Sequence, residues 1–247
     1  MLVNKFLKVV LLLLGGIFIL FQGFALEAEG AIVSTIMLVL LTILYHRFTE
    51  NKTKYFLWFL IIFTTAHFWS LLSWYLPEIP ASKIDYHYYG ANILYIISYI
   101  FLIVKVLVNL KFREVFAELS IPIIILLILD VFCVVVVTDT AEGALSFSQY
   151  ILEFIYNSVI MALLSSALIN YMYRNDNKSM QFLIGSICIV FSEIIQLAYY
   201  YILLDDQNLG LIYSFFLVVA FSFFYAQSQL QFTGPIPSYL DEQLEEV

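Results

Sequence analysis

The stretch IVFSEIIQLAYYYILL, residues 189–204, places a single carboxylate, Glu193, inside an otherwise apolar and aromatic run. It belongs to a longer apolar segment, 180–204, whose length is typical of a helix that crosses a membrane. No basic residue lies near Glu193 in the sequence. A charge at the bilayer centre costs about 2.5–3.5 kcal/mol even on insertion-based scales, so an acid at this position needs a reason.

The composition of the whole chain is that of an integral membrane protein. Of its 247 residues, 63% are hydrophobic and 12% are charged, whereas a soluble domain has about 25% charged residues. A water-soluble fold of this size could not hide so much apolar surface. The net charge of −8 and the lack of a long basic run argue against nucleic acid as a partner.

Apolar runs long enough to cross the hydrocarbon core recur along the chain. They cover approximately residues 6–26, 31–48, 54–76, 89–110, 119–138, 150–173, 180–204 and 209–230. The connections are short, and barrel strands would instead alternate in polarity over about ten residues. We therefore predict an all-α membrane protein, an eight-transmembrane-helix bundle in a single domain, 1–230, followed by a short acidic cytoplasmic tail, 231–247.

The loops between these runs alternate in charge. Basic residues occupy the N-terminus and every second loop: Lys5, Lys8, Arg47, Lys52, Lys54, Lys111, Arg113, Arg174 and Lys178. The other loops contain one base, Lys83, and the acids Glu27, Glu29, Glu78, Asp85, Asp139, Glu142, Asp205 and Asp206. The positive-inside rule then places both termini in the cytoplasm. We expect the protein in the bacterial inner (plasma) membrane.

The first thirty residues also fit a second interpretation. MLVNKFLKVVLLLLGGIFILFQGFALEAEG has two lysines, an apolar core and then small residues, as a secretory signal peptide does. Cleavage would leave seven helices. The segment has no clear A-x-A cleavage site, and its apolar run is long enough to span, so eight spans is the preferred prediction.

Three titratable side chains are predicted at a similar depth. Glu193 lies about thirteen residues into the seventh span, His67 about thirteen residues into the third, and Asp130 near the middle of the fifth. These spans run in the same direction, and Gln196 and Ser70 follow one turn beyond Glu193 and His67. We predict a shared polar pocket in the outer half of the bundle. The alternative is three separate hydrogen bonds between helices, with neutral acids.

Other polar residues within the spans have simpler interpretations. Lys105 lies near the cytoplasmic end of its span and can extend its ammonium to the interface. Glu153 is expected at the outer interface, and Asn157 can hydrogen-bond across helices. Pro122 is expected near a helix start, where proline is tolerated. Tyrosines near the outer span ends are typical of an aromatic belt: Tyr86, Tyr88, Tyr89, Tyr199, Tyr200 and Tyr201.

The sequence offers no metal or cofactor motif. It contains no CxxC, HExxH, GxxxxGK[ST] or GxSxG pattern, and its three histidines are scattered. Cys133 and Cys188 lie in apolar runs and are expected to be small buried residues without a disulfide. No cofactor is expected.

The second half of the chain resembles the YhhN-like membrane family, which includes lysoplasmalogenases. The resemblance lies in YNSVIMALLSSALI (156–169), GSICIVFSE (185–193) and FFYAQSQL (223–230). In that family the seventh helix has Gly followed seven and eight residues later by Ser-Asp, which is similar to Gly185, Ser192 and Glu193 here. Tyr156 and Met161 match the sixth-helix pattern, and Phe223, Phe224, Ala226 and Gln227 match the last. The first half departs from the family: a third-helix Gly-Asp is replaced by Ala66 and His67, and a fourth-helix Gly and His by Gly90 and Ser98.

The resemblance implies hydrolysis of the vinyl ether bond of a lysoplasmalogen-type lipid. Such a bond is cleaved by protonating a carbon, and burial favours a neutral carboxylic acid that can supply the proton. We therefore expect Glu193 to be the proton donor, His67 to orient water and Asp130 to stabilise the cation. The residues expected at the substrate are Ser192, Gln196, Ser98, Tyr156, Asn157 and Gln227. The alternatives are a non-catalytic lipid-binding or scaffold protein and a small carrier or sensor. The sequence indicates neither the headgroup nor the oligomeric state.

Overall fold

The computed structural model describes residues 2–50, 52–77, 84–202 and 207–231, and within this part of the chain every regular element is helical. The long helices are α1 (Leu2–Gly23), α2 (Glu27–Phe48), α3 (Lys54–Ser73), α4 (Tyr86–Leu107), α5 (Phe112–Asp139), α6 (Phe147–Arg174), α7 (Asn177–Tyr201) and α8 (Gln207–Ser228), and the short 3₁₀ helix η1 (Glu142–Ala144) precedes α6. All 8 long helices are long and apolar enough to cross a membrane. The predicted all-α, eight-helix membrane bundle is confirmed. Glu78, Lys83, Asp205, Asp206 and the tail from residue 232 onward lie outside the described residues.

Polar caps start three helices earlier than the apolar pattern predicted. The Asp85 side chain accepts backbone hydrogen bonds of 2.9 and 3.0 Å, and α4 begins at residue 86 instead of 89. Ser146 forms a capping box at the start of α6, and Asp176 accepts a 2.7 Å bond from a backbone N–H at the start of α7. These side chains satisfy N–H groups that have no partner inside the helix, so the helix can extend into polar sequence.

The fifth helix differs most from its prediction. It begins at Phe112 rather than near 119, but a break at Leu119 divides it, so Pro122 lies near the start of the second helical segment, as expected. Leu119, three residues earlier, has the non-helical angles φ −115° and ψ 22°. Proline lacks the N–H for the i to i−4 hydrogen bond, and its ring clashes with the preceding turn. The result is a kink that joins two helical segments.

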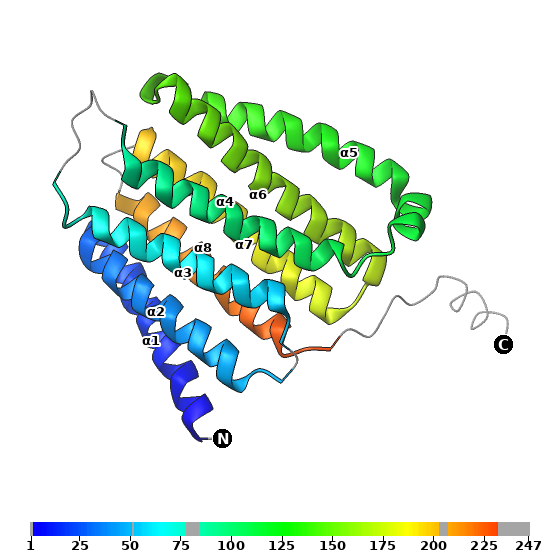
Figure 1. The fold of residues 1–247 in the computed structure, drawn as a ribbon, viewed down its shortest axis with the longest axis horizontal. Coiled ribbons are helices and arrows are strands. Elements are labelled where there is room, and N and C mark those ends of the chain that lie inside the picture. The colour runs from blue at the N-terminus through cyan, green and yellow to red at the C-terminus, as the bar shows by residue number, and fades with distance from the viewer. Residues whose placement is uncertain (1, 51, 78–83, 203–206, 232–247) are drawn as a thin grey trace.

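The helices pack mainly against their neighbours in sequence, with two exceptions (Figure 1). α4 packs against α6, and α1 packs against α8. α5 lies at one side of the bundle and packs against α6 (Figure 1). The prediction that the third, fifth and seventh spans meet is therefore wrong for the fifth. Much of α5 presents large apolar side chains outward, as expected where a helix contacts lipid tails.

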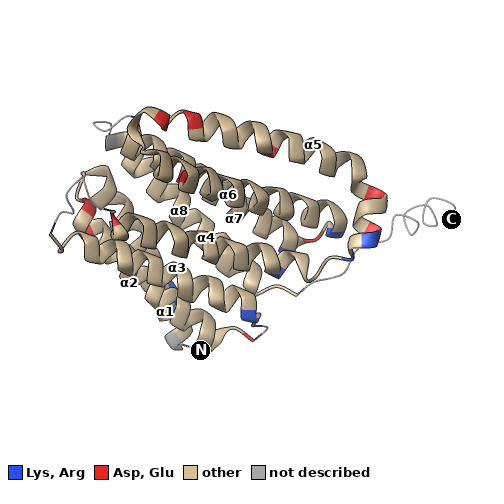
Figure 2. Ribbon diagram, turned by 45° about the horizontal axis from the view of Figure 1, so that its top comes forward, with Lys and Arg blue, Asp and Glu red and all other residues tan. Residues whose placement is uncertain are grey.

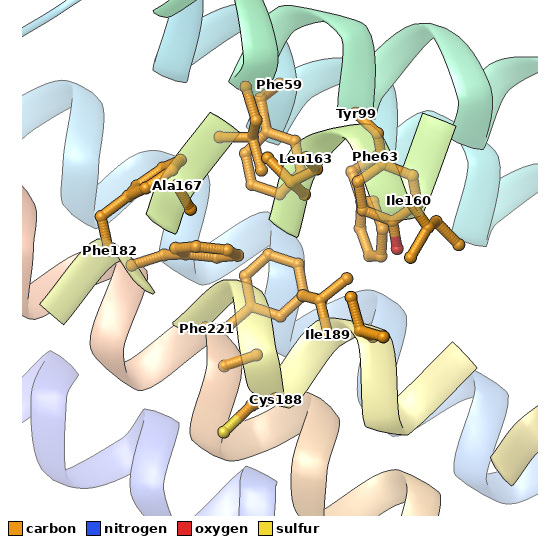
Figure 3. Close-up of a cluster of buried hydrophobic side chains, with 14 of the residues drawn as sticks. Phe59, Phe63, Tyr99, Ile160, Leu163, Ala167, Phe182, Cys188, Ile189 and Phe221 are labelled. Atoms are coloured by element: carbon orange, nitrogen blue, oxygen red, sulfur yellow. The ribbon is translucent and has the colours of Figure 1, made fainter. Parts of the chain in front are cut away.

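An aromatic core fills the centre of the bundle. The rings of Phe59 and Phe221 stack with centroids 5.8 Å apart, and Phe63 lies 5.0 Å from Phe221 (Figure 3). Cys188 lies beside this core and Cys133 is partly buried, and neither forms a disulfide (Figure 3). The expectation of small buried cysteines is confirmed for Cys188. The core fills one half of the bundle, and the polar side chains of the interior lie in the other half.

Charge is unevenly distributed between the two ends of the bundle. The described lysines and arginines lie toward the end that holds the α2–α3, α4–α5 and α6–α7 connections, together with some acids (Figure 2). At the opposite end, the described charged residues are acidic: Glu27, Glu29, Asp85, Asp139, Glu142 and Glu153. The two ends are called below the basic end and the acidic end.

Candidate active site

A polar cavity occupies the half of the bundle toward the acidic end. It has two parts that share walls, with volumes of about 70 and 460 Å³. All the long helices except α5 contribute to the described lining. The residues common to both parts are Ser70, Tyr95, Tyr156, Glu193, Gln196 and Tyr200. His67 lines the smaller part, so the structure brings Glu193 and His67 to one cavity, as the sequence predicted.

Two tyrosines from different helices hold the Glu193 carboxylate. Tyr99 of α4 donates a short hydrogen bond to Oε1, and Tyr156 of α6 donates to Oε2 at 2.8 Å. The two rings meet edge to face, with centroids 6.1 Å apart. Within the described part of the chain, the one ion pair joins exposed Lys111 and Glu114, so no described base pairs with Glu193. The acid in the opening stretch is thus satisfied by neutral donors.

His67 faces the same cavity through aromatic contacts. Its ring lies 5.0 Å from that of Phe63 and 5.5 Å from that of Tyr95. Phe63 in turn lies 5.8 Å from Tyr99, which bonds Glu193. His67 makes no hydrogen bond with any described residue, so its ring nitrogens are available to water or a ligand in the cavity.

Helical spacing explains why these side chains converge. Residues three and four apart lie on one face of a helix. The cavity face of α4 repeats at intervals of four, three and four: Tyr88, Asn92, Tyr95 and Tyr99. The cavity face of α3 follows the same rule: Phe63, His67, Ser70 and Trp74. The cavity face of α7 consists of Glu193, Gln196 and Tyr200.

A second acid lies near the mouth of the larger part. Glu153 of α6 is buried and its Oε1 accepts a 2.6 Å hydrogen bond from the Tyr88 hydroxyl. Glu153 thus lies near the outer end of its span, as expected, but its side chain faces the cavity. Asp85 and His87 also line this part, and the His87 Nδ1 is buried without a hydrogen-bond partner among the described residues. No described lysine or arginine lines either part.

Asp130 does not belong to this cavity. It lies on α5, where its Oδ1 accepts a 2.8 Å hydrogen bond from Ser165 of α6. The prediction that Asp130 shares a pocket with Glu193 and His67 is wrong, because α5 lies outside the ring of helices that encloses the cavity. Equal depth along the membrane normal does not bring two residues together when their helices are not neighbours.

The other predicted substrate residues divide into two groups. Tyr156, Asn157 and Gln196 line the cavity, although the Asn157 amide also donates to Thr138 at 3.1 Å. Three further residues, Ser98, Ser192 and Gln227, do not line it: Ser98 donates to its own helix, Ser192 to the Tyr213 carbonyl and Gln227 to the Phe224 carbonyl, at 2.6, 2.9 and 2.9 Å. These three residues support the helices and do not face the cavity.

Several tyrosines predicted to form an aromatic belt instead face the interior. Tyr88, Tyr200 and Tyr201 line the larger part of the cavity, and Tyr199 donates a 2.5 Å hydrogen bond to Glu27 of α2. Tyr86 is exposed, as a belt residue would be. Tyr99 and Tyr95 were not predicted as site residues at all. Their spacing from Tyr88 was the available signal, since eleven residues cover about three helical turns.

Lys105 is also placed differently from its prediction. It is 5% exposed and does not reach the interface. Its ammonium lies 4.8 Å from the ring centroid of Phe56 and 4.6 Å from that of Phe182, and it has no hydrogen-bond partner among the described residues. Cation–π contacts of this kind can stabilise a desolvated cation. The residue belongs to the closely packed basic half and not to the polar cavity.

The described residues contain no group of three or more His, Cys, Asp or Glu side chains that could hold a metal ion. The cavity instead offers carboxyl groups, imidazoles and phenols, which can transfer protons and orient water. Comparisons with models of protein families, with curated proteins and with solved structures find no match to this chain.

Proposed function

We propose that the cavity hydrolyses the vinyl ether bond of a lysoplasmalogen-type lipid, with Glu193 as the proton donor. The observation that carries this proposal is the environment of Glu193: a carboxyl group within a span, without a described cationic partner, held at the wall of a polar cavity by Tyr99 and Tyr156. Desolvation favours the neutral acid, which is the form that can give up a proton.

The reaction begins with transfer of the Glu193 proton to the β-carbon of the enol ether. The carbon–carbon double bond supplies the electron pair for the new C–H bond, and the adjacent carbon becomes part of an oxocarbenium ion. Glu193 is left as a carboxylate. The Tyr99 and Tyr156 hydroxyls already point at its two oxygens, and hydrogen bonds to a charged acceptor are stronger than those to a neutral one. The two phenols therefore stabilise the state that follows proton transfer.

Water completes the reaction. It adds to the cationic carbon and loses a proton, which forms a hemiacetal, and His67 is the group that can orient that water or accept its proton. The hemiacetal then collapses to a fatty aldehyde and a glycerophospholipid alcohol, and the proton returns to Glu193. Since Asp130 lies elsewhere, Glu153 is the second carboxyl group on the cavity wall that can favour the cation electrostatically.

Glu193→Gln tests this role directly. The amide keeps the shape and most of the hydrogen bonding of the acid but has no acidic proton. We expect purified wild-type protein to release fatty aldehyde from a lysoplasmalogen in micelles, and the variant to be at least 10²-fold slower, the usual contribution of a general acid. The matched control is Asp130→Asn, an acid-to-amide change within a membrane span but outside the cavity, which should leave aldehyde release unchanged. Absence of turnover in the wild type would contradict the proposal.

A non-catalytic lipid-binding role is the second candidate. It is favoured by the engagement of both Glu193 oxygens, because a carboxyl group with two tyrosine donors can simply join α4, α6 and α7. In that case Glu193→Gln would lower thermal stability, and lipid binding would persist without aldehyde release in any variant. The two measurements together separate the candidates.

We further propose that the basic end faces the cytoplasm of a bacterial inner membrane, with both termini on that side and the cavity opening outward. The positive-inside rule supports this orientation, because the described bases gather at one end. Reporter fusions at residues 52 and 176 should be cytoplasmic, and fusions at 82, 142 and 206 should be external. The reversed pattern would exclude the orientation but not the chemistry.

A further inference from the structure

An apolar groove beside α1, separate from the polar cavity, has a cation at its rim. It has a volume of about 190 Å³ and is lined by residues of α1, α2 and α8. Its walls are mostly aliphatic and aromatic: Leu11, Leu12, Met37, Leu41, Leu44, Val218 and Phe221. The polar members of the lining are Lys8, Ser222 and Tyr225.

The packing of α1 explains why the groove exists. A Cβ added to Gly15 would lie 2.8 Å from Val218 of α8, and one added to Gly23 would lie 3.0 Å from Leu211. The C-terminal half of α1 is therefore in close contact with α8. The groove begins on the N-terminal side of Gly15, where Leu12, Leu11 and Lys8 face it. The outer surface there is open to the membrane, since Leu12 is 66% exposed.

Lys8 places a positive charge at one end of the groove. Its ammonium lies 5.3 Å from the ring centroid of Tyr225, near the C-terminal end of α8. No described carboxylate pairs with it, because the ion pair within the described residues is Lys111–Glu114. Lys5 is one turn nearer the helix start, and the described bases gather at this end of the bundle (Figure 2). A cation without a counter-ion among the described residues thus lies at the basic end of an apolar groove.

We propose that this groove binds one anionic phospholipid, with an acyl chain against the aliphatic walls and its phosphate headgroup at Lys8. The apolar lining matches a hydrocarbon chain and excludes a water-soluble anion from the deeper part of the groove. The Lys8 ammonium, which no described carboxylate pairs, matches a negative headgroup, and each basic residue near an anionic membrane surface contributes about 1 kcal/mol of binding. This site is separate from the proposed catalytic cavity and does not depend on any activity there.

Native mass spectrometry of the full-length protein tests the proposal, with phosphatidylglycerol and phosphatidylcholine of identical acyl chains as probes. We expect one tightly bound phosphatidylglycerol in the wild type. Lys8→Gln should weaken that binding roughly fivefold, the factor that about 1 kcal/mol represents, and should remove the preference over phosphatidylcholine. Lys52→Gln, an exposed base at the same end, is the matched control and should keep the preference.

A second variant tests the groove itself. Ser222 is exposed at the groove wall and its hydroxyl bonds only the Val218 carbonyl of its own helix, so Ser222→Trp fills the groove without removing a contact between helices. We expect it to displace both lipids. Equal retention of the two lipids by the wild type, or an unchanged preference in Lys8→Gln, would overturn the proposal. Equally tight binding of glycerophosphoglycerol, which lacks acyl chains, would overturn it too.

Discussion

Two carboxylates lie within the membrane-spanning helices, and their surroundings differ. Glu193 on α7 accepts hydrogen bonds from Tyr99 of α4 and Tyr156 of α6, and lines a cavity with His67. Asp130 on α5 accepts one bond from Ser165 and lines neither part of that cavity. The comparison teaches that an intramembrane acid has a candidate function when several helices converge on it. An acid at a two-helix contact can be explained by that contact alone.

Removal of the imidazole should have the largest effect among changes around Glu193. His67→Phe keeps a ring next to Phe63 and Tyr95 but has no nitrogen to orient water. We expect aldehyde release to fall about 10²-fold, within the range for loss of a general base, with little change in thermal stability. Single-turnover kinetics on a lysoplasmalogen would measure it. Unchanged turnover would show that water is activated elsewhere.

Loss of the phenol hydroxyls should have an intermediate effect. Tyr99→Phe or Tyr156→Phe each removes one hydrogen bond to the Glu193 carboxylate. A hydrogen bond to a charged group is worth about 1.5–3 kcal/mol, so each change should slow proton transfer by about one order of magnitude or more. The double variant should fall short of the product of the two effects, because both act on one group. Exact additivity would mean that the two tyrosines act independently of each other.

The smallest effect is expected at the other carboxylate. Asp130→Asn keeps an oxygen that can accept the Ser165 hydrogen bond. We expect less than a twofold change in aldehyde release and a change in unfolding free energy of about 1 kcal/mol or less. A thermal melt in detergent and the same activity assay would measure both. A large loss of activity here would break the distinction between the two regions.

The sequence was sufficient for the fold class and for half of the site. Hydrophobic run length defined eight helices because lipid requires every backbone polar group to be satisfied within the span. Depth arguments correctly associated His67 with Glu193. They failed for Asp130, since hydropathy contains no information about which helices are neighbours. They also missed Tyr99, because a tyrosine within an apolar span is equally consistent with the core, the belt and a binding site. Only the contact between α4, α6 and α7 distinguishes these possibilities.

The peripheral position of α5 has a consequence for the order of the chain. α4 and α6 pack side by side and are separated by one crossing, so they traverse the membrane in the same direction. Two parallel neighbours need a return connection, and α5 is that connection. α5 crosses the bundle over a fixed length. Tyr88 is therefore at the same depth as Glu153, and Tyr99 is at the same depth as Tyr156. A helix that gives no side chain to the cavity thereby sets the register of the two helices that do.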